Sequence, residues 1–139
     1  MEEKMVNKWS KTSHERLSSC HVDLQRVFNK VLIYRDCSVL EGERGAETQN
    51  KYYAEGKSRL TYPHSMHNKR PSLAVDVVPY PVPDWNDPRP FIRFGMFVIG
   101  LAAGIDVNLR WGGDWDRDFD LKDQRFNDYP HFELHGVEK

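Results

Sequence analysis

Two histidines and two aspartates are the residues of this chain best suited to metal-assisted chemistry. His67 and Asp76 lie in one stretch near the middle of the chain, and Asp128 and His131 lie in another near its end. Two neutral imidazoles and one carboxylate are a common open zinc set, which leaves a fourth position for water. A further carboxylate close by, here Asp128, is the proton acceptor that such a water needs. These residue types predict a zinc hydrolase.

Each candidate ligand also has an ordinary interpretation when it is considered alone. His67 lies among basic residues, where most loop histidines are simply solvated. Asp76 interrupts the apolar stretch 73–78, and a buried carboxylate needs a partner or a metal ion; an aspartate on the solvated face of an edge strand is the alternative. His131 begins a short apolar stretch, as a core histidine would. Only the combination of the three residues favours a metal site.

A second histidine near the end of the chain, His135, is not expected to share a metal ion with His131. The helical zinc motif places glutamate directly after its first histidine, whereas Glu133 follows two residues after His131. Pro130 leaves room for little helix. In a strand the two histidines are about 13 Å apart, at roughly 6.6 Å for each two-residue step. We therefore assign His131 alone.

The hydrophobic pattern predicts short helices and strands in mixed order around these residues. Apolar residues that recur at three- and four-residue steps indicate helices, and β-branched runs indicate strands. Since no regular βαβ rhythm is present, we expect an α+β fold with a small, mostly antiparallel sheet and packed helices. The expected helices cover residues 13–34, 46–54 and 91–105, the expected strands cover 37–40, 73–78, 107–111 and 131–134, and prolines forbid regular structure between 79 and 90.

Length and composition favour one globular domain. A chain of 139 residues buries about two thirds of its unfolded surface. We expect residues 1–12 to form a flexible leader and residues 13–139 to form a single domain. A net charge of −1 gives no reason to expect nucleic acid or an anionic membrane as a partner. The longest apolar stretch, 94–105, is too short to cross a bilayer, and the acidic start of the chain is unlike a signal peptide.

The segments that carry the candidate metal site resemble a known enzyme family. The matching motifs are Ser-x-His, Ala-x-Asp and Asp-x-x-His-Phe-Glu, at Ser65, His67, Ala74, Asp76, Asp128, His131 and Glu133. They are similar to motifs of zinc peptidoglycan peptidases of the VanY and D-alanyl-D-alanine carboxypeptidase type. The phage endolysins of that family, which are L-alanyl-D-glutamate endopeptidases, resemble the chain more closely. Arg44 with Gln49, and the Trp-Gly-Gly-Asp-Trp stretch 111–115, extend the resemblance over about residues 13–135.

This resemblance implies a fold and individual residue roles. The fold would be Hedgehog/DD-peptidase-like, and the residues that would hold zinc are His67, Asp76 and His131. Asp128 would act as the catalytic base, and Arg44 would lie over the substrate, where it would hold the scissile carbonyl oxygen or a carboxylate. Without the resemblance, a surface ion pair of Arg44 with Glu41 or Glu43 is the alternative. Ser65 and Trp111 would bind the substrate together with Arg44.

Two features of the motifs differ from the usual family pattern. His67 and Asp76 are two residues further apart than in Ser-x-His-x-x-Gly-x-Ala-x-Asp, and the glycine is missing. We expect the loop before Asp76 to absorb the extra residues while the strand keeps its register. Asp128 stands where many members have glutamate, and the endopeptidase branch is more similar to the chain at this position.

The function implied by the resemblance is zinc-dependent cleavage of the L-alanyl-D-glutamate bond of peptidoglycan stem peptides by a phage endolysin. Such an enzyme would act as a monomer on bacterial peptidoglycan, without binding nucleic acid or inserting into a membrane. It would accumulate in the host cytoplasm until lysis and then act on the cell wall. The alternatives are a D-alanyl-D-alanine carboxypeptidase or dipeptidase, and a non-catalytic module that binds the cell wall.

An acidic segment precedes Asp128 and permits a second metal site. Asp116, Asp118 and Asp120 stand at alternate positions, as in a calcium loop, and hard oxygen donors suit Ca²⁺. However, Leu121 occupies the sixth loop position, where glycine is expected, and no glutamate stands at the twelfth. A solvated acidic loop is the preferred interpretation, with Ca²⁺ as a second candidate cofactor.

Overall fold

The computed structural model describes residues 6–122 and 127–136. Its helices and strands are α1 (Lys11–Ser18), α2 (Val22–Tyr34), β1 (Cys37–Glu41), α3 (Ala46–Ala54), the 3₁₀ turn η1 (Met66–Asn68), β2 (Ala74–Pro79), α4 (Pro88–Gly104), β3 (Leu109–Gly112) and β4 (Asp128–Leu134). The strands form one sheet in the order β1-β2-β4-β3, and every neighbouring pair is antiparallel. The predicted α+β class with a small antiparallel sheet is confirmed.

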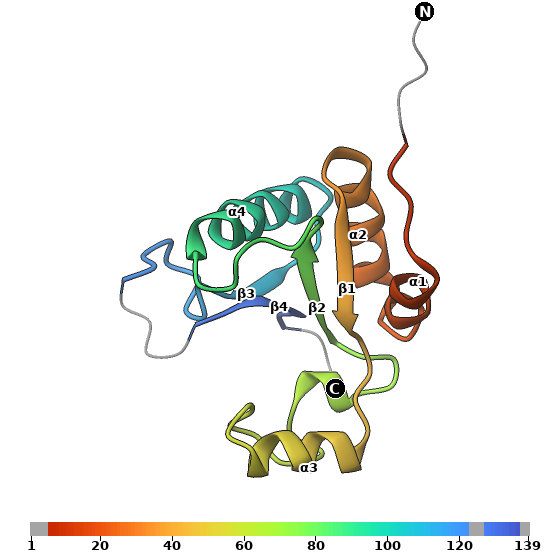
Figure 1. The fold of residues 1–139 in the computed structure, drawn as a ribbon, viewed down its shortest axis with the longest axis vertical. Helices are drawn as coiled ribbons and strands as arrows, with labels where there is room; N and C mark the ends of the chain where they lie inside the picture. The colour runs from red at the N-terminus through yellow and green to blue at the C-terminus, as the bar shows by residue number, and fades with distance from the viewer. Residues whose placement is uncertain (1–5, 123–126, 137–139) are drawn as a thin grey trace, which may run out of the picture.

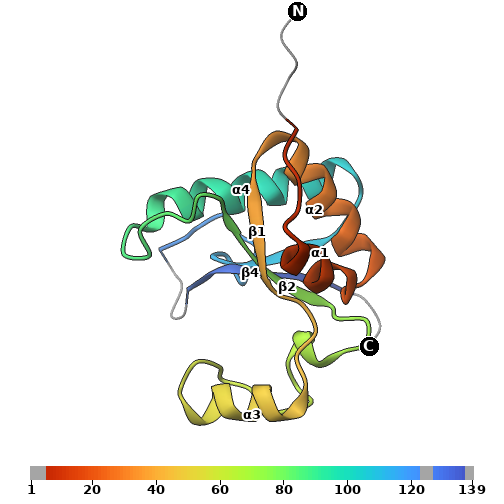
Figure 2. The ribbon, with the colours of Figure 1, turned by 45° about the vertical axis from the view of Figure 1, so that its right-hand side comes forward.

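The two faces of the sheet have different partners. Val75, Val77 and Phe132 are buried in the hydrophobic core, and α4 packs against β2, β3 and β4 on that side. Since side chains alternate along a strand, Asp76 and His131 lie on the opposite face. Figures 1 and 2 show α2 and α4 together on one side of the sheet and α3 standing apart from them. The sheet therefore separates an apolar core from a polar face.

The sequence predicts one continuous helix over residues 13–34, but the structure has two helices there, α1 and α2. The prediction of a single helix was therefore wrong. The break after α1 forms a parallel bridge between Cys20 and Ser72, in which the backbone N–H of His21 donates to the carbonyl of Ser72 at 2.8 Å. His21 then caps α2, because its ring accepts from the backbone N–H of Asp23. A long-range backbone contact, which periodicity does not report, divides the helix.

Helix α4 and strand β4 both begin three residues earlier than predicted. Asp87 caps α4 through the backbone N–H of Arg89, and Pro88 and Pro90 lie in the first turn, where a missing N–H costs no hydrogen bond. Residues 88–90 are therefore helical, and the expectation that prolines forbid regular structure as far as Pro90 was wrong for these three residues. No helix within the described ranges has the length and apolar character needed to cross a membrane.

The described part of the expected leader makes specific contacts with the domain. The indole N–H of Trp9 donates to Oδ1 of Asn29 at 2.7 Å, and the amide of Asn7 donates to the carbonyl of Leu32 at 2.8 Å. Helix α1 already begins at Lys11. The division into a leader and a catalytic domain stays a prediction, with these contacts tying residues 7–9 to α2.

Candidate metal site

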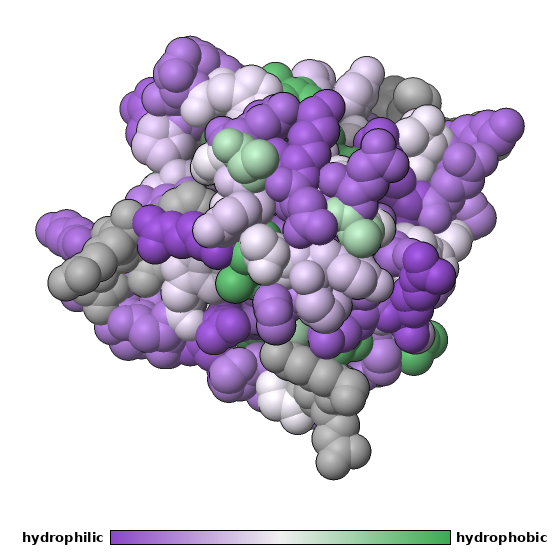
Figure 3. All heavy atoms as spheres, turned by 90° about the horizontal axis from the view of Figure 1, so that it is seen from below, coloured by the Kyte–Doolittle hydropathy of each residue, from purple (hydrophilic) through white to green (hydrophobic). Residues whose placement is uncertain are grey.

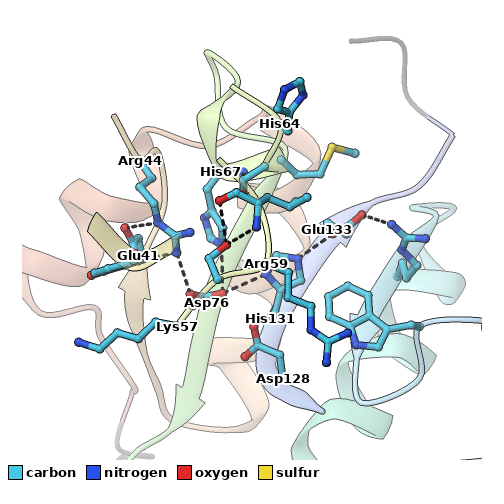
Figure 4. Close-up of a pocket in the computed structure, with 17 residues that line it drawn as sticks. Glu41, Arg44, Lys57, Arg59, His64, His67, Asp76, Asp128, His131 and Glu133 are labelled. Carbon is cyan, nitrogen blue, oxygen red and sulfur yellow. Dashed lines mark hydrogen bonds and ion pairs between the residues drawn. The ribbon is translucent and has the colours of Figure 1, made fainter. Parts of the chain in front are cut away.

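Three residues from three separate elements converge on the polar face of the sheet. Oδ1 of Asp76 lies 3.2 Å from Nε2 of His67 and 3.3 Å from Nδ1 of His131. The three side chains offer ligand atoms that all lie within 4.8 Å of one another. Asp76 comes from β2, His131 from β4 and His67 from η1 (Figure 4). The structure thus brings together the three ligands predicted from the sequence.

His67 is positioned by a capped turn outside the sheet. The hydroxyl of Ser65 accepts from the backbone N–H of His67 at 3.2 Å, and the side chain of Asn68 accepts from the backbone N–H of Ser65 at 3.0 Å. The Asn68 amide also donates to the carbonyl of Arg44 at 3.0 Å, which ties the turn to the segment after β1. The residues between η1 and β2 form the loop that separates His67 from Asp76, and absorption of the two extra residues in this loop stays a prediction.

Each imidazole uses one nitrogen for a protein partner and presents the other to Asp76. Nδ1 of His67 lies 2.7 Å from the carbonyl of Gly42, and Nε2 of His131 lies 2.7 Å from Oε1 of Glu133. Neither oxygen can donate, so both of these nitrogens carry a proton and donate it. Nε2 of His67 and Nδ1 of His131 are therefore the nitrogens that can bind a metal ion.

The donor set fits zinc in type and in spacing. Two imidazoles and a carboxylate with an open position are typical of catalytic zinc sites. For bonds of about 2.0–2.1 Å and tetrahedral angles, neighbouring ligand atoms lie about 3.3 Å apart. The Asp76 oxygen is 3.2 Å and 3.3 Å from the two imidazole nitrogens. Protein partners for the far nitrogen of each histidine are a further typical feature of metal sites.

Burial and charge shift the protonation of this cluster. Burial alone raises the pKa of Asp76, but the charges and hydrogen bonds of His67 and His131 hold that pKa well below its usual range. Burial lowers the pKa of His131, but hydrogen bonds to Asp76 and Glu133 outweigh it and raise the pKa to about 10. This proton must leave Nδ1 before a metal ion can bind there, so metal binding depends on pH.

Asp128 lies at the start of β4 and faces the same cavity as the three ligands (Figure 4). Burial is the main cause that raises the pKa of Asp128, and the nearby charge of Asp76 raises it further. A carboxylate with a raised pKa is a better proton acceptor near neutral pH. The residue predicted as the base therefore lines the same cavity with a raised pKa, and its catalytic role stays a prediction.

A cavity of about 730 Å³ opens over the cluster, a volume within the range of small-molecule and peptide sites. The charged side chains in its wall are four basic and four acidic residues: Arg44, Lys57, Arg59, Arg110, Glu41, Asp76, Asp128 and Glu133. Hydrophilic side chains also dominate the face of the molecule seen in Figure 3, with only small hydrophobic patches. The site suits a polar, charged substrate.

Arg44 lines the cavity, and its guanidinium is held on several sides. Nε and Nη2 donate to the two carboxylate oxygens of Glu41, each at 2.9 Å, and Nη1 donates to Gln49 at 2.9 Å. The guanidinium also lies over the ring of Tyr52, 4.8 Å from its centre. Nη2 is 3.8 Å from Oδ2 of Asp76. Arg44 is thus oriented toward the cluster, with one N–H on each of Nη1 and Nη2 left for a further acceptor.

The two other predicted substrate-binding residues lie in different places. Ser65 lines the cavity, where its hydroxyl caps η1. Trp111 is only 1% exposed and packs in the core, with its N–H donated to the carbonyl of Tyr129. Alternation along β3 explains this position, because Arg110 faces the site and Trp111 faces the helices. The structure does not bring Trp111 to the cavity, whose wall contains Trp115.

The acidic segment brings together a slightly different set from the one predicted. Asp114, Asp116 and Asp118 offer carboxylate oxygens close enough to share an ion, whereas Asp120 accepts from the backbone N–H of Lys122. Asp114 is buried and accepts from the backbone N–H of residues 118 and 119. These contacts are also what a well-formed loop requires, so calcium binding stays a prediction.

The sequence analysis assigned no role in the site to two of its carboxylates, although Glu41 was one of two expected ion-pair partners of Arg44 and Glu133 belongs to the matching motif. Glu41 clamps Arg44, and Glu133 contacts His131. The sequence does contain a sign of the contact between Glu133 and His131, since residues two apart on a strand share a face. The contact between Glu41 and Arg44 depends on the fold of the segment after β1.

The chain resembles known proteins over nearly its whole length. The family model of phage L-alanyl-D-glutamate peptidases matches residues 5–135, a range that includes all the ligand candidates. Among solved structures, the Serratia marcescens L-Ala D-Glu endopeptidase ChiX is 30% identical, with a TM-score of 0.71, and the match covers 91% of this chain and 88% of that chain. No curated protein sequence matches the chain.

Proposed function

The chain belongs to the family of phage L-alanyl-D-glutamate peptidases, and we propose that it cleaves this bond in peptidoglycan with a zinc ion held by His67, Asp76 and His131. The observation that carries the proposal is the convergence of these side chains on one another, with Oδ1 of Asp76 3.2 Å and 3.3 Å from the two imidazole nitrogens. A zinc ion in this position supplies a Lewis acid, which makes water more acidic and polarises a carbonyl.

Asp128 is the general base and later the general acid. Its carboxylate takes a proton from the attacking water and returns it to the amine that leaves when the peptide bond breaks. The raised pKa of Asp128 supports this role, because it brings the group closer to the working pH. Nε2 of His131 cannot take this proton from the water, because it already carries a proton that it donates to Glu133.

Arg44 orients the substrate and stabilises the negative charge that develops on the scissile carbonyl oxygen. Its contacts with Glu41, Gln49 and Tyr52 fix the guanidinium before the substrate arrives. Preorganised donors of this kind need no rearrangement at the moment of reaction. Ser65 contributes indirectly to substrate placement, because its hydroxyl holds the turn that carries His67.

The physiological substrate in this proposal is bacterial peptidoglycan, and the setting is lysis of the host cell. A zinc ion adds two positive charges to a cavity wall with equal numbers of acidic and basic side chains. The loaded cavity therefore attracts the carboxylates of stem peptides. The protein accumulates in the host cytoplasm and acts as a monomer once it reaches the cell wall.

Digestion of purified peptidoglycan tests the bond that is cleaved. The proposal predicts new D-glutamate amino termini, identified by mass spectrometry, and none when Asp128 is replaced by asparagine. Release of free D-alanine would instead identify a carboxypeptidase. Binding to peptidoglycan without any new terminus would identify a non-catalytic wall-binding module.

A further inference from the structure

We propose that Glu133 is a positioning residue that fixes the orientation and the tautomer of His131, and that Arg110 holds Glu133 in place for this task. The inference rests on the proposed function, since it takes His131 to bind zinc through Nδ1. It extends the site by two residues that are not ligands. Both residues line the cavity wall.

Glu133 faces the ring nitrogen of His131 that points away from Asp76 (Figure 4). Its Oε1 lies 2.7 Å from Nε2 of His131, and Glu133 is only 4% exposed. A carboxylate accepts but does not donate when ionised, so Nε2 must carry the proton. Because a neutral imidazole has a single ring proton, Nδ1 keeps its lone pair for the metal ion. The contact therefore selects the tautomer that the site needs.

The register of the sheet builds this arrangement. His131 and Glu133 are two residues apart on β4 and share a face. Arg110 on β3 is the cross-strand partner of Glu133, and its Nη2 lies 2.7 Å from Oε2 of Glu133. The glutamate thus joins the ligand through one oxygen and the guanidinium through the other.

Arg110 contacts both Glu133 and the ring of Trp115. Its guanidinium lies 5.6 Å from the centre of the Trp115 ring, and that ring lies 5.2 Å from the ring of His131. Nε of Arg110 is, among the described residues, the buried side-chain nitrogen without a hydrogen-bond partner. The contacts of the guanidinium that the structure shows are therefore the bond to Glu133 and the ring of Trp115.

The two histidine ligands have partners of different charge. The far nitrogen of His67 donates to a neutral carbonyl, that of Gly42, whereas His131 donates to an ionised carboxylate. A carboxylate partner makes the imidazole a stronger ligand and restrains its ring. His131 is consequently the ligand whose strength depends on a side chain, and this dependence can be tested by substitution.

Glu133→Gln, which keeps the shape and removes the charge, is the direct test. Loss of a partner of this kind weakens metal binding by about 10–100-fold. We expect that increase in the zinc dissociation constant, measured by competition with a chromophoric chelator at fixed pH, and a smaller increase for Arg110→Gln. Asp23→Asn is the matched control, because it removes a carboxylate paired with Arg26 at 2.9 Å on the surface; its zinc affinity should equal that of the wild type.

A second readout separates positioning from a merely structural role. Cobalt(II) bound in place of zinc reports ligand geometry through its visible absorption spectrum. The proposal predicts a changed spectrum for Glu133→Gln. A structural role alone would lower the free energy of unfolding of the metal-free protein and leave both the spectrum and the affinity of the folded protein unchanged.

Unchanged zinc affinity and an unchanged cobalt spectrum in both variants would overturn the inference. If Glu133→Gln fails to fold, Arg110→Gln decides, since it leaves the carboxylate in place and removes its support. The wild type is assayed first for zinc-dependent cleavage. Failure at that step contradicts the proposed function, whereas an active wild type with equal affinities in the variants contradicts only the role of Glu133.

Discussion

Asp76 and His131 are cross-strand partners in the antiparallel pair of β2 and β4, and Nδ1 of His131 lies 3.3 Å from Oδ1 of Asp76. The pairing places both side chains on the polar face of the sheet, so the register alone brings together two ligands that are distant in the sequence. His67 reaches the same point from η1, outside the sheet. The site therefore depends on sheet register for two ligands and on a capped turn for the third.

Substitution His131→Ala should raise the zinc dissociation constant by at least about 100-fold, since it removes a ligand, and even the loss of a ligand's partner costs about 10–100-fold. His135→Ala is the control, because His135 does not belong to the cluster. Metal content after gel filtration and a chelator competition measure the effect. Equal zinc retention by both variants would contradict the assignment of His131.

Asp128→Asn should retain zinc and lower kcat by about 100–10,000-fold, the usual contribution of a general base. The asparagine keeps the size of the side chain but cannot accept the proton. Asp23→Asn, which removes a surface carboxylate paired with Arg26, is the control for charge removal and should leave kcat unchanged. A wild-type kcat for Asp128→Asn with zinc bound would exclude Asp128 as the base.

Arg44→Lys should lower kcat/KM by about 100-fold while zinc stays bound, comparable to the loss of one oxyanion donor. Lysine keeps the charge, but it cannot contact the two carboxylate oxygens of Glu41 and the side-chain oxygen of Gln49 at the same time. Arg70→Lys, in an exposed pair with Glu43 at 2.8 Å, is the matched control. Steady-state kinetics on soluble muropeptides compare the two, and equal values would show that Arg44 has no role in turnover.

The metal-free protein should lose stability as pH rises from about 7 toward 10. In the folded protein, hydrogen bonds to Asp76 and Glu133 outweigh burial and raise the pKa of His131 to about 10, while an unfolded histidine has a pKa of about 6.5. The protonated histidine therefore stabilises the fold fully below about pH 6.5, and this contribution is lost as pH rises through about 10.

Urea unfolding in the presence of chelator, at several pH values, measures this dependence. His131→Gln should have a flatter profile over the same interval, whereas His135→Ala should follow the wild type. A wild-type profile as flat as that of His131→Gln would show that His131 is not protonated in the metal-free fold.

Two glycines of α4 should respond in opposite ways to alanine. A Cβ on Gly95 would overlap the indole of Trp111, which is buried and cannot move freely, so Gly95→Ala should cost about 1–3 kcal/mol of unfolding free energy. A Cβ on Gly100 meets nothing within 4 Å, and Gly100→Ala should add about 0.5–1 kcal/mol through helix propensity. Denaturant unfolding checks both, and equal effects would contradict the packing of Trp111 on α4.

Much of the fold follows from local patterns in the sequence. The helix over residues 46–54 has the predicted bounds, and the strand that carries Asp76 is close to its predicted position. These elements depend on propensity and alternation, which short windows report well. The division between α1 and α2 depends instead on a backbone bridge to Ser72, and no local pattern reports such a contact.

The three residues that converge on the polar face were singled out from the sequence, whereas their surroundings were predicted less well. His67, Asp76 and His131 carry recognisable motifs, whereas the clamp of Glu41 on Arg44 follows from the chain path after β1. Alternation along residues 107–111 was visible in the sequence, and it already implies that Trp111 and Arg110 lie on opposite faces. Which face belongs to the core became clear only with the packing of α4.

Restoration of activity by zinc is the sharpest test of a zinc-dependent peptidase. Protein stripped of metal is titrated with zinc, and new D-glutamate amino termini are counted on a defined muropeptide containing the L-alanyl-D-glutamate bond. A zinc-dependent peptidase should show no cleavage without metal, a linear rise in rate and a plateau at about one zinc ion per chain, as three ligands with one open position imply. Full cleavage by the stripped protein in excess chelator would contradict it.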